Sequence, residues 1–256
     1  MSILVHCEKG IGRVTLNRPD RRNAFDAAMV DEIRQAFERL GKERSIRVIV
    51  LTGAGEIFCA GADLHWMGPD RAVSAAKGRQ DAKQLMKMFR TINDCSCPVI
   101  GRIQGAAYGG GIGLIAVCDI ALAAADSAFA FSEVRLGLVP AIIAPLILRK
   151  TGESFTRRFC LTGESFSATT AREAGLIHEV VDRAALDVHV TALAEHMALV
   201  APQAARDTKA LLRRLGQLSM EEAWKLCVDA NVRARLSEEA QEGIRSFRDR
   251  RAPVWD

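Results

Sequence analysis

Two short buried strands separated by a helix are the feature that most constrains how this chain can fold. Residues 47–51 and 99–103 are almost continuously apolar, and residues 73–92 between them have helical periodicity. Such runs are typical of parallel strands covered on both faces, and a parallel pair needs a long crossover connection. The sequence therefore predicts an α/β fold with helices packed against a sheet.

The first 53 residues repeat this alternation. Residues 3–16 form short apolar runs broken by Lys9-Gly10-Ile11-Gly12, which predicts a hairpin. Asp26 can cap a following helix, and we expect Gly41 to end it. The apolar positions of this helix fall on one face: Met29, Ile33, Ala36, Phe37 and Leu40.

The second half of the chain is predicted to be mainly helical. Gly109-Gly110-Gly111 precedes a predicted helix at residues 112–117, with strands expected at 120–123 and 128–131. Beyond Ala141 the periodicity is mostly helical, with one short strand candidate at 177–181. We therefore expect an α/β core over residues 1–195 and a helical region over residues 196–256.

Composition narrows the class of protein. A chain of 256 residues that is 49% hydrophobic can bury a substantial core. The net charge of +4 comes from interspersed residues of both signs, so we expect neither nucleic acid nor a membrane as partner. No apolar stretch reaches membrane-spanning length, and the first ten residues do not resemble a secretory signal. We expect a cytoplasmic enzyme.

The cysteines favour a reducing compartment. There are seven, an odd and scattered number that fits buried thiols better than a disulfide framework. Cys95 and Cys97 form a lone C-x-C without a second Cys/His pair at zinc spacing, so no metal site is expected.

Two glycine-bearing loops lie at predicted strand-to-helix junctions, at residues 58–64 and 108–113. Small side chains there expose backbone N–H groups, which stabilise an oxygen that gains negative charge during a reaction. One such loop would more simply reflect close packing. Two loops together favour an oxyanion site.

The second loop also permits a nucleotide-binding interpretation. Residues 111–116 fit G-x-G-x-x-A, and Glu133 follows at a suitable distance. In that motif the glycines should follow the strand directly, whereas residues 104–110 intervene here. The motif alone therefore gives weak support for a dinucleotide site.

Several blocks, taken in order, resemble one known family. They are Asn17-Arg18-Pro19 with Asn23-Ala24, residues 53–64, the Gly109 loop with Cys118-Asp119-Ile120, residues 131–140, and residues 161–177. With this order and spacing, the whole chain resembles the crotonase (enoyl-CoA hydratase/isomerase) superfamily. The resemblance implies a superhelix of repeated ββα turns, a C-terminal helical trimerisation region, and assembly as a homotrimer or homohexamer.

The resemblance also implies an acyl-CoA thioester substrate, with coenzyme A as part of that substrate and no separate cofactor. Ala62 and Gly110 would supply the two N–H donors to the thioester oxygen, and Glu133 would be the acid/base. The predicted substrate and CoA contacts are Arg22, Ala24, Ala60, Asp63, Leu64, Tyr108, Gly113, Phe247 and Arg250.

Glu133 suits an acid/base on chemical grounds. We expect it at the end of a short strand among the apolar residues Phe131, Val134 and Leu136. An apolar environment raises the pKa of a carboxyl group, as proton transfer near neutral pH requires.

One position departs from the family pattern. Typical hydratases carry a second glutamate three residues after the middle glycine, and here that residue is Gly113. The motifs at residues 108–114 and 132–140 look most like the branch that hydrates methylglutaconyl-CoA or isohexenylglutaconyl-CoA. We therefore hypothesise that the missing side chain makes room for a branched acyl group. Arg135, expected on the same strand face as Glu133, is a candidate to hold a distal carboxylate.

Three functions remain open from the sequence. The leading one is hydration of a branched 2-enoyl-CoA with Glu133 as the single acid/base. The second is Δ3,Δ2-enoyl-CoA isomerisation, which also needs one carboxylate. The third is a non-catalytic acyl-CoA binding subunit.

Overall fold

A six-stranded sheet forms the centre of the protein, whose computed structural model describes residues 1–67, 74–216 and 218–255. Its strands, in spatial order, are β1 (Ile3–Glu8), β2 (Ile11–Leu16), β3 (Val48–Gly53), β4 (Val99–Ile103), β6 (Ile120–Ala124) and β9 (Glu179–Val181). The pair β1–β2 is antiparallel, which confirms the hairpin, and every following pair is parallel.

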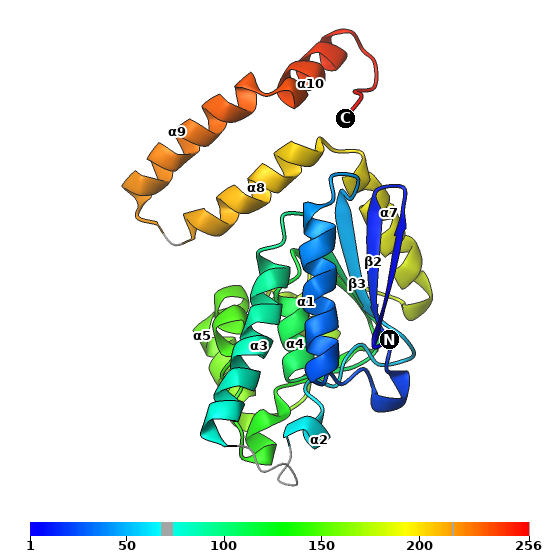
Figure 1. Ribbon diagram of the computed structural model, residues 1–256, viewed down its shortest axis with the longest axis vertical. Helices are drawn as coiled ribbons and strands as arrows, with labels where there is room; N and C mark the ends of the chain where they lie inside the picture. Colours follow the sequence, from blue (N-terminus) through cyan, green and yellow to red (C-terminus); the bar gives the residue numbers. More distant parts are fainter. Residues whose placement is uncertain (68–73, 217, 256) are drawn as a thin grey trace.

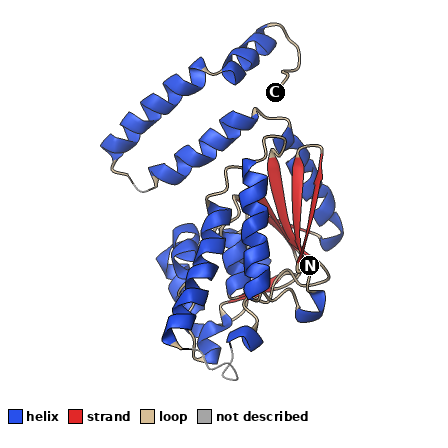
Figure 2. Cartoon of the chain, in the orientation of Figure 1, coloured by secondary structure: helices blue, strands red, loops and turns tan. Residues whose placement is uncertain are grey.

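Helices cover both faces of this sheet, because its central strands are apolar on both sides. All six residues of β3 are buried. Val48 and Val50 face α7 (Leu186–Ala198), whereas Ile49 and Leu51 belong to the larger core under α1 (Ala27–Lys42). Figure 1 shows α7 on one side of the sheet and α1 on the other, and Figure 2 shows the strands between these helical layers.

A second, three-stranded sheet lies beside the first. It consists of β5 (Ala107–Tyr108), β7 (Ala128–Ala130) and β8 (Phe166–Ser167), with β5 parallel and β8 antiparallel to β7. Two of these strands are only two residues long, and the sequence pattern did not predict them. Phe166 packs against Phe129 and Phe131, with ring centroids 5.6 and 5.7 Å away, and joins this sheet to the core.

The other core helices are α2 (Leu64–Met67), α3 (Ala75–Asn93), α4 (Gly110–Ala116), α5 (Ala144–Thr162) and α6 (Ala168–Glu173), with three short 3-10 helices η1 (Pro19–Arg21), η2 (Ser132–Leu136) and η3 (Arg183–Ala185). The predicted start of the second long helix, Val73, lies outside the described residues. Helix α4 starts at Gly110, two residues earlier than predicted, because Gly109 takes a positive φ of 46° and serves as its N-cap.

The expectation that Gly41 ends the first helix is wrong, since α1 continues to Lys42. A Cβ at position 41 would lie 3.1 Å from Sγ of Cys95. Glycine at this position therefore allows a close approach of two segments, and the helix ends two residues beyond Leu40.

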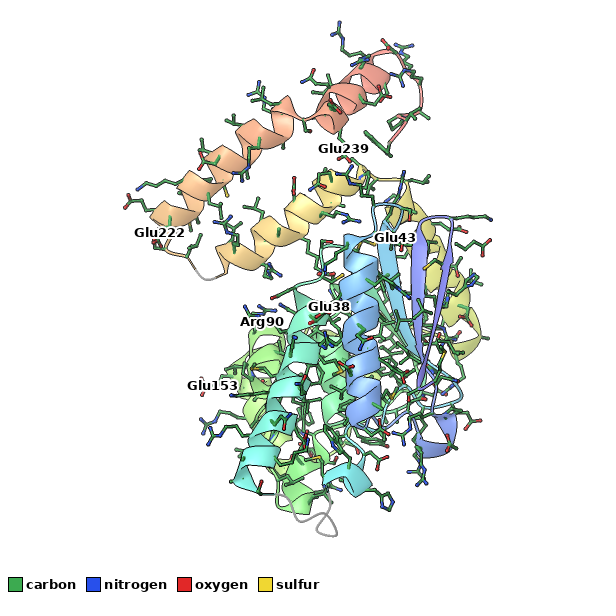
Figure 3. All side chains as sticks on the ribbon, viewed as in Figure 1. Glu38, Glu43, Arg90, Glu153, Glu222 and Glu239 are labelled. Carbon is green, nitrogen blue, oxygen red and sulfur yellow. The ribbon has the colours of Figure 1, made fainter. Side chains whose placement is uncertain are left out.

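Three helices at the C-terminal end form an arm that extends from the core: α8 (Pro202–Leu215), α9 (Met220–Leu236) and α10 (Glu238–Arg248) (Figure 1). Glu239 of α10 reaches toward the start of α8 (Figure 3), where its carboxylate accepts hydrogen bonds from the backbone N–H groups of Gln203 and Ala204. The first N–H groups of a helix have no partner within it, so this carboxylate caps α8.

The arm is held to the core by three cations of α8, one of which, Arg213, lies 2.8 Å from the carboxylate of Asp94 at the end of α3. Lys209 Nζ lies 2.6 Å from Oδ2 of Asp119 and donates to the carbonyl oxygen of Cys97 at 2.9 Å. Arg206 donates to the carbonyl oxygens of Gly41, Glu43 and Ile46, near the end of α1. The Lys209 side chain is only 10% exposed, so solvent screens its ion pair weakly.

The described residues show no group of three or more His, Cys, Asp or Glu side chains that could hold a metal ion. All seven cysteines are free thiols. In the same residues no single helix has the length and apolar character to cross a membrane. The bent pair 183–198 and 202–215, at 104°, passes that test only when both helices are combined.

We expect Lys209→Met to lower the free energy of unfolding by about 1–3 kcal/mol, because Asp119 and a buried carbonyl lose their partner while the aliphatic stem is kept. Urea unfolding followed by circular dichroism measures this difference. The matched control is Lys225→Met, which removes the exposed pair with Glu221 and should leave stability unchanged. Equal losses in the two variants would contradict this account of the arm.

Candidate active site

The first glycine loop, residues 59–63, is clamped between two other segments. On one side, Phe25 donates its N–H to Gly61 and accepts from Asp63, while Ala60 donates to Arg22. On the other side, the N–H of Tyr108 donates to the carbonyl oxygen of Cys59. Backbone hydrogen bonds on both edges therefore fix the position of Ala62.

The second glycine loop meets the first by direct backbone contact. Gly61 has a φ of 87°, and a Cβ there would lie 2.7 Å from the carbonyl oxygen of Tyr108 and 3.2 Å from the nitrogen of Gly110. Only glycine permits this approach. Among the described residues, no hydrogen bond occupies the N–H of Ala62 or Gly110. The two loops that carry the predicted donors are thus held against one another, and both N–H groups remain available.

The Glu133 carboxylate lies directly against the second loop. A Cβ on Gly109 would be 2.7 Å from Oε1 of Glu133, so the absence of a side chain at position 109 leaves room for the carboxylate. Within the described chain, Oε2 is buried and has no hydrogen-bond partner. Burial raises the pKa of Glu133 above its ordinary value near 4.5, while a hydrogen bond from its own backbone opposes this shift.

The expected position of Glu133 at the end of a strand is wrong. Strand β7 ends at Ala130, and Glu133 lies in the 3-10 helix η2. In such a helix successive side chains do not alternate between two faces, so residues two apart do not share one. Of the apolar neighbours that suggested a strand, Leu136 lines the cavity together with Glu133, whereas Phe131 packs against Phe166 and Val134 lies against Gly163.

Because this segment is a 3-10 helix, Arg135 is no longer a candidate to hold a distal carboxylate of the substrate. That role requires a regular strand with Arg135 on the same face as Glu133, whereas in η2 Arg135 is exposed and lies against Gly163. Arg135 does not line the cavity that contains Glu133.

A cavity of about 280 Å³ brings the site together. Five of the predicted residues line it: Ala60, Ala62, Leu64, Gly110 and Glu133. The remaining lining residues are largely apolar: Phe25, Gly61, Met67, Leu85, Gly109, Ser132, Leu136, Leu138, Val139, Pro140, Ala141, Ile142 and Ile143. Glu133 is the one ionisable group among these lining residues.

Three predicted contacts lie near the cavity without lining it. The carboxylate of Asp63 forms an ion pair with Arg18 at 3.1 Å, and the carbonyl oxygen of Ala24 accepts from the same arginine at 2.7 Å. Tyr108 contributes its backbone to the loop contact. Arg18 also pairs with Asp26. Beyond its place in the Asn17-Arg18-Pro19 block, no feature of the sequence indicated this role for Arg18.

The side chains of three others lie elsewhere. Arg22 contacts the first loop through its carbonyl oxygen, but its exposed side chain lines a separate cavity with Pro19 and Glu56. Phe247 is 87% exposed on α10, and Arg250 follows that helix. Figure 1 shows α10 at the opposite end of the molecule from α2, so a single chain does not bring Phe247 or Arg250 to the cavity.

The structure corrects the hypothesis that Gly113 opens space for substrate. Gly113 is buried inside α4, and a Cβ there would overlap Cγ2 of Ile143 and lie 2.9 Å from the ring of Phe89. Ile143 itself lines the cavity. The space beside Gly113 is therefore already filled by hydrocarbon.

Two rival sites receive little support. Gly109 forms the turn between β5 and α4, whereas Gly111 and Gly113 already lie within α4, so the G-x-G pattern is not at the strand-to-helix turn that a dinucleotide site needs. A larger cavity of about 810 Å³ lies near the β1–β2 turn and α7. It contains none of the predicted site residues.

We expect Glu133→Gln to gain stability relative to the native chain as pH rises from 4.5 to 7.5. Because the folded pKa of Glu133 is raised, its ionisation costs stability above the unfolded pKa, and glutamine removes that cost. Urea unfolding at both pH values measures the difference. Glu153→Gln at the exposed position labelled in Figure 3 is the control, and an equal pH effect there would contradict the assignment.

Comparison with known proteins identifies the family. The enoyl-CoA hydratase/isomerase family matches residues 6–256. The enoyl-CoA hydratase AKT6-1 of Alternaria alternata is 36% identical over 208 residues, covering 81% of this chain and 68% of that protein. The peroxisomal Delta(3,5)-Delta(2,4)-dienoyl-CoA isomerase of Arabidopsis thaliana is 30% identical, covering 96% and 92%. The crystal structure of an enoyl-CoA hydratase from Shewanella pealeana superposes with a TM-score of 0.95 at 33% identity, covering 100% and 96%. The chain therefore has the crotonase fold and belongs to the enoyl-CoA hydratase/isomerase family.

Proposed function

We propose that this enzyme adds water to a 2-enoyl-CoA, with Glu133 as its single acid/base and the N–H groups of Ala62 and Gly110 as donors to the thioester oxygen. One observation carries this proposal: a buried carboxylate oxygen without a partner lies beside two loops whose facing amides are also unoccupied. An acid/base and an oxyanion site must adjoin in this way for proton transfer next to a polarised carbonyl.

The residues divide the reaction between them. Glu133 takes a proton from water while the oxygen of that water bonds to the β-carbon. The electron pair of the double bond moves onto the thioester carbonyl, and the two amides hold the resulting enolate oxygen. Glu133 then returns the proton to the α-carbon. Since the lining residues offer no second carboxylate, one group performs both transfers.

Isomerisation is the second candidate, and the hydrocarbon beside Gly113 favours it. A single carboxylate with no polar group opposite can move a proton from the α-carbon of a 3-enoyl thioester to its γ-carbon. Ile143 and Phe89 occupy the space where a second glutamate would hold water. The 30% identical Arabidopsis protein is named as an isomerase.

The acyl group is proposed from sequence resemblance to be branched and of the glutaconyl type. Its hydrocarbon part suits the apolar lining, but none of the cavity residues is a cation that would bind a distal carboxylate. That carboxylate must therefore find its partner outside this set of residues.

We extend the proposal to the assembled enzyme. Coenzyme A is carried by the substrate and not as a cofactor, with Leu64 and the neighbouring loop backbone along its path. Phe247 and Arg250 would contribute to the site of a neighbouring copy in a homotrimer or homohexamer, because in their own chain they lie far from the cavity (Figure 1).

We expect Gly61→Ala to lower kcat/KM at least 100-fold, since a Cβ there pushes the two loops apart and misplaces a donor worth about 3 kcal/mol. The absorbance red shift of a bound, conjugated arylacryloyl-CoA reports the same loss of carbonyl polarisation. The control is Gly152→Ala, which shares a positive φ of 73° but has open space around its Cβ. That variant should lose stability and keep the red shift.

A substrate panel separates the candidate functions. The assay follows the absorbance of the conjugated thioester with 3-methylglutaconyl-CoA, 3-methylcrotonyl-CoA, crotonyl-CoA and a 3-enoyl-CoA, with product masses. Loss of absorbance with the 2-enoyl substrates supports hydration, and a preference for the acidic substrate over 3-methylcrotonyl-CoA supports the glutaconyl type. Absorbance gained from the 3-enoyl substrate alone would replace hydration with isomerisation.

In the same panel, Glu133→Gln should lose at least 100-fold in kcat/KM while still binding acyl-CoA. The acid limb of the native pH profile should lie above the ordinary pKa of glutamate, because the base must be ionised and burial raises its pKa. Full activity in the glutamine variant would leave the non-catalytic binding subunit as the better interpretation.

A further inference from the structure

The chain that follows Glu133 forms a continuous hydrocarbon wall. Between positions 136 and 143, every residue except Gly137 lines the cavity, and none of the lining side chains carries a polar group. Because Glu133 acts at the carbons next to the thioester, an acyl chain that extends past it must run along this wall. The wall therefore contacts the part of the substrate that lies beyond its reacting carbons.

The wall changes from buried to exposed along its length. Ile143 is only 3% exposed, whereas Leu136, Leu138 and Val139 are 53%, 39% and 72% exposed. Across the mouth, Leu64 and Met67 are 54% and 48% exposed. Apolar side chains gathered around the mouth of a cavity are unusual for an uncovered surface and typically mark a binding surface.

The cavity is too small to hold a long acyl chain by itself. Its volume of about 280 Å³ lies just below the range of roughly 300–1,000 Å³ for small-molecule sites. Ile143 and Phe89 close the space next to Gly113, so the chain cannot extend in that direction. Further carbons must lie on the apolar rim formed by Leu136, Leu138 and Val139.

We propose that the acyl group of the substrate has a hydrocarbon arm of about eight or more carbons that covers this rim, with Val139 as a residue that selects for it. The proposal rests on the acyl-CoA function proposed above and names its substrate class. In a β-branched acyl group this arm would lie on the rim, and any acidic arm would leave in another direction. The rim is continuous with the cavity that contains Glu133, which identifies the substrate itself as its occupant.

Binding of saturated acyl-CoA thioesters tests the proposal without requiring turnover. Isothermal titration calorimetry compares butyryl-, hexanoyl-, octanoyl- and decanoyl-CoA. Each added methylene should lower Kd about two- to fourfold, with the upper value expected for full burial and the lower one for a half-covered rim. From butyryl- to decanoyl-CoA the total gain is then on the order of 50-fold or more.

Val139→Ser should weaken binding of decanoyl-CoA several-fold more than binding of butyryl-CoA, because only the longer chain reaches the rim. The matched control is Val188→Ser on α7, where the valine is 70% exposed and lies outside the cavity. It should leave the ratio of the two Kd values unchanged. Leu136→Ser provides a second rim variant with the same expected direction.

A Kd that is constant from butyryl- to decanoyl-CoA would overturn the proposal, as would equal Kd ratios in the Val139 and Val188 variants. Failure of the proposed catalytic function gives a different result. In that case affinity would still rise with chain length, but no 2-enoyl or 3-enoyl substrate would be converted.

Discussion

The contact between the backbones at Gly61 and Tyr108 is the constraint on which the proposed active site depends. An oxyanion site works only if its donors are in place before charge develops, and that requires two amides from distant parts of the chain to be held rigidly. The hydrogen bonds of residues 59–63 to Phe25 and to Tyr108 achieve this from both edges of the loop. Arg18, which links Asp26 and Asp63, fixes the outer side of the same arrangement.

Burial of Glu133 gives the site a useful carboxylate at a cost in stability. Burial raises the pKa of Glu133, and the lack of a partner for Oε2 leaves this oxygen available to substrate or water. The same two features disfavour the ionised folded state at neutral pH. If Glu133 is the acid/base that we propose, stability and reactivity conflict at this residue, as is common at active sites.

Much of this structure was accessible from the sequence because its signals are local. Continuous apolar runs identified β3 and β4, and the apolar face of residues 29–40 identified α1. Small residues at strand-to-helix junctions located both loops of the site. The two-residue strands β5 and β8 are too short for a periodic signal, and they depend on pairing with β7.

The errors arose where a local pattern fits two conformations or where a distant segment fills the space. Apolar neighbours around Glu133 fit a strand as well as a 3-10 helix, and the structure resolves this through the 3-10 turn that begins two residues after β7. Gly113 suggested empty space, but Phe89 and Ile143, from residues before and after it in the chain, fill that space. No pattern near position 113 contains this information.

That packing has a consequence for how the site can evolve. A glutamate at position 113 cannot be introduced by one substitution, because Ile143 already occupies the room it would need. Ile143 would have to shrink first, and that step alone creates a cavity without restoring any polar group. A change to a two-carboxylate site would therefore have to pass through an intermediate that gains no catalytic group.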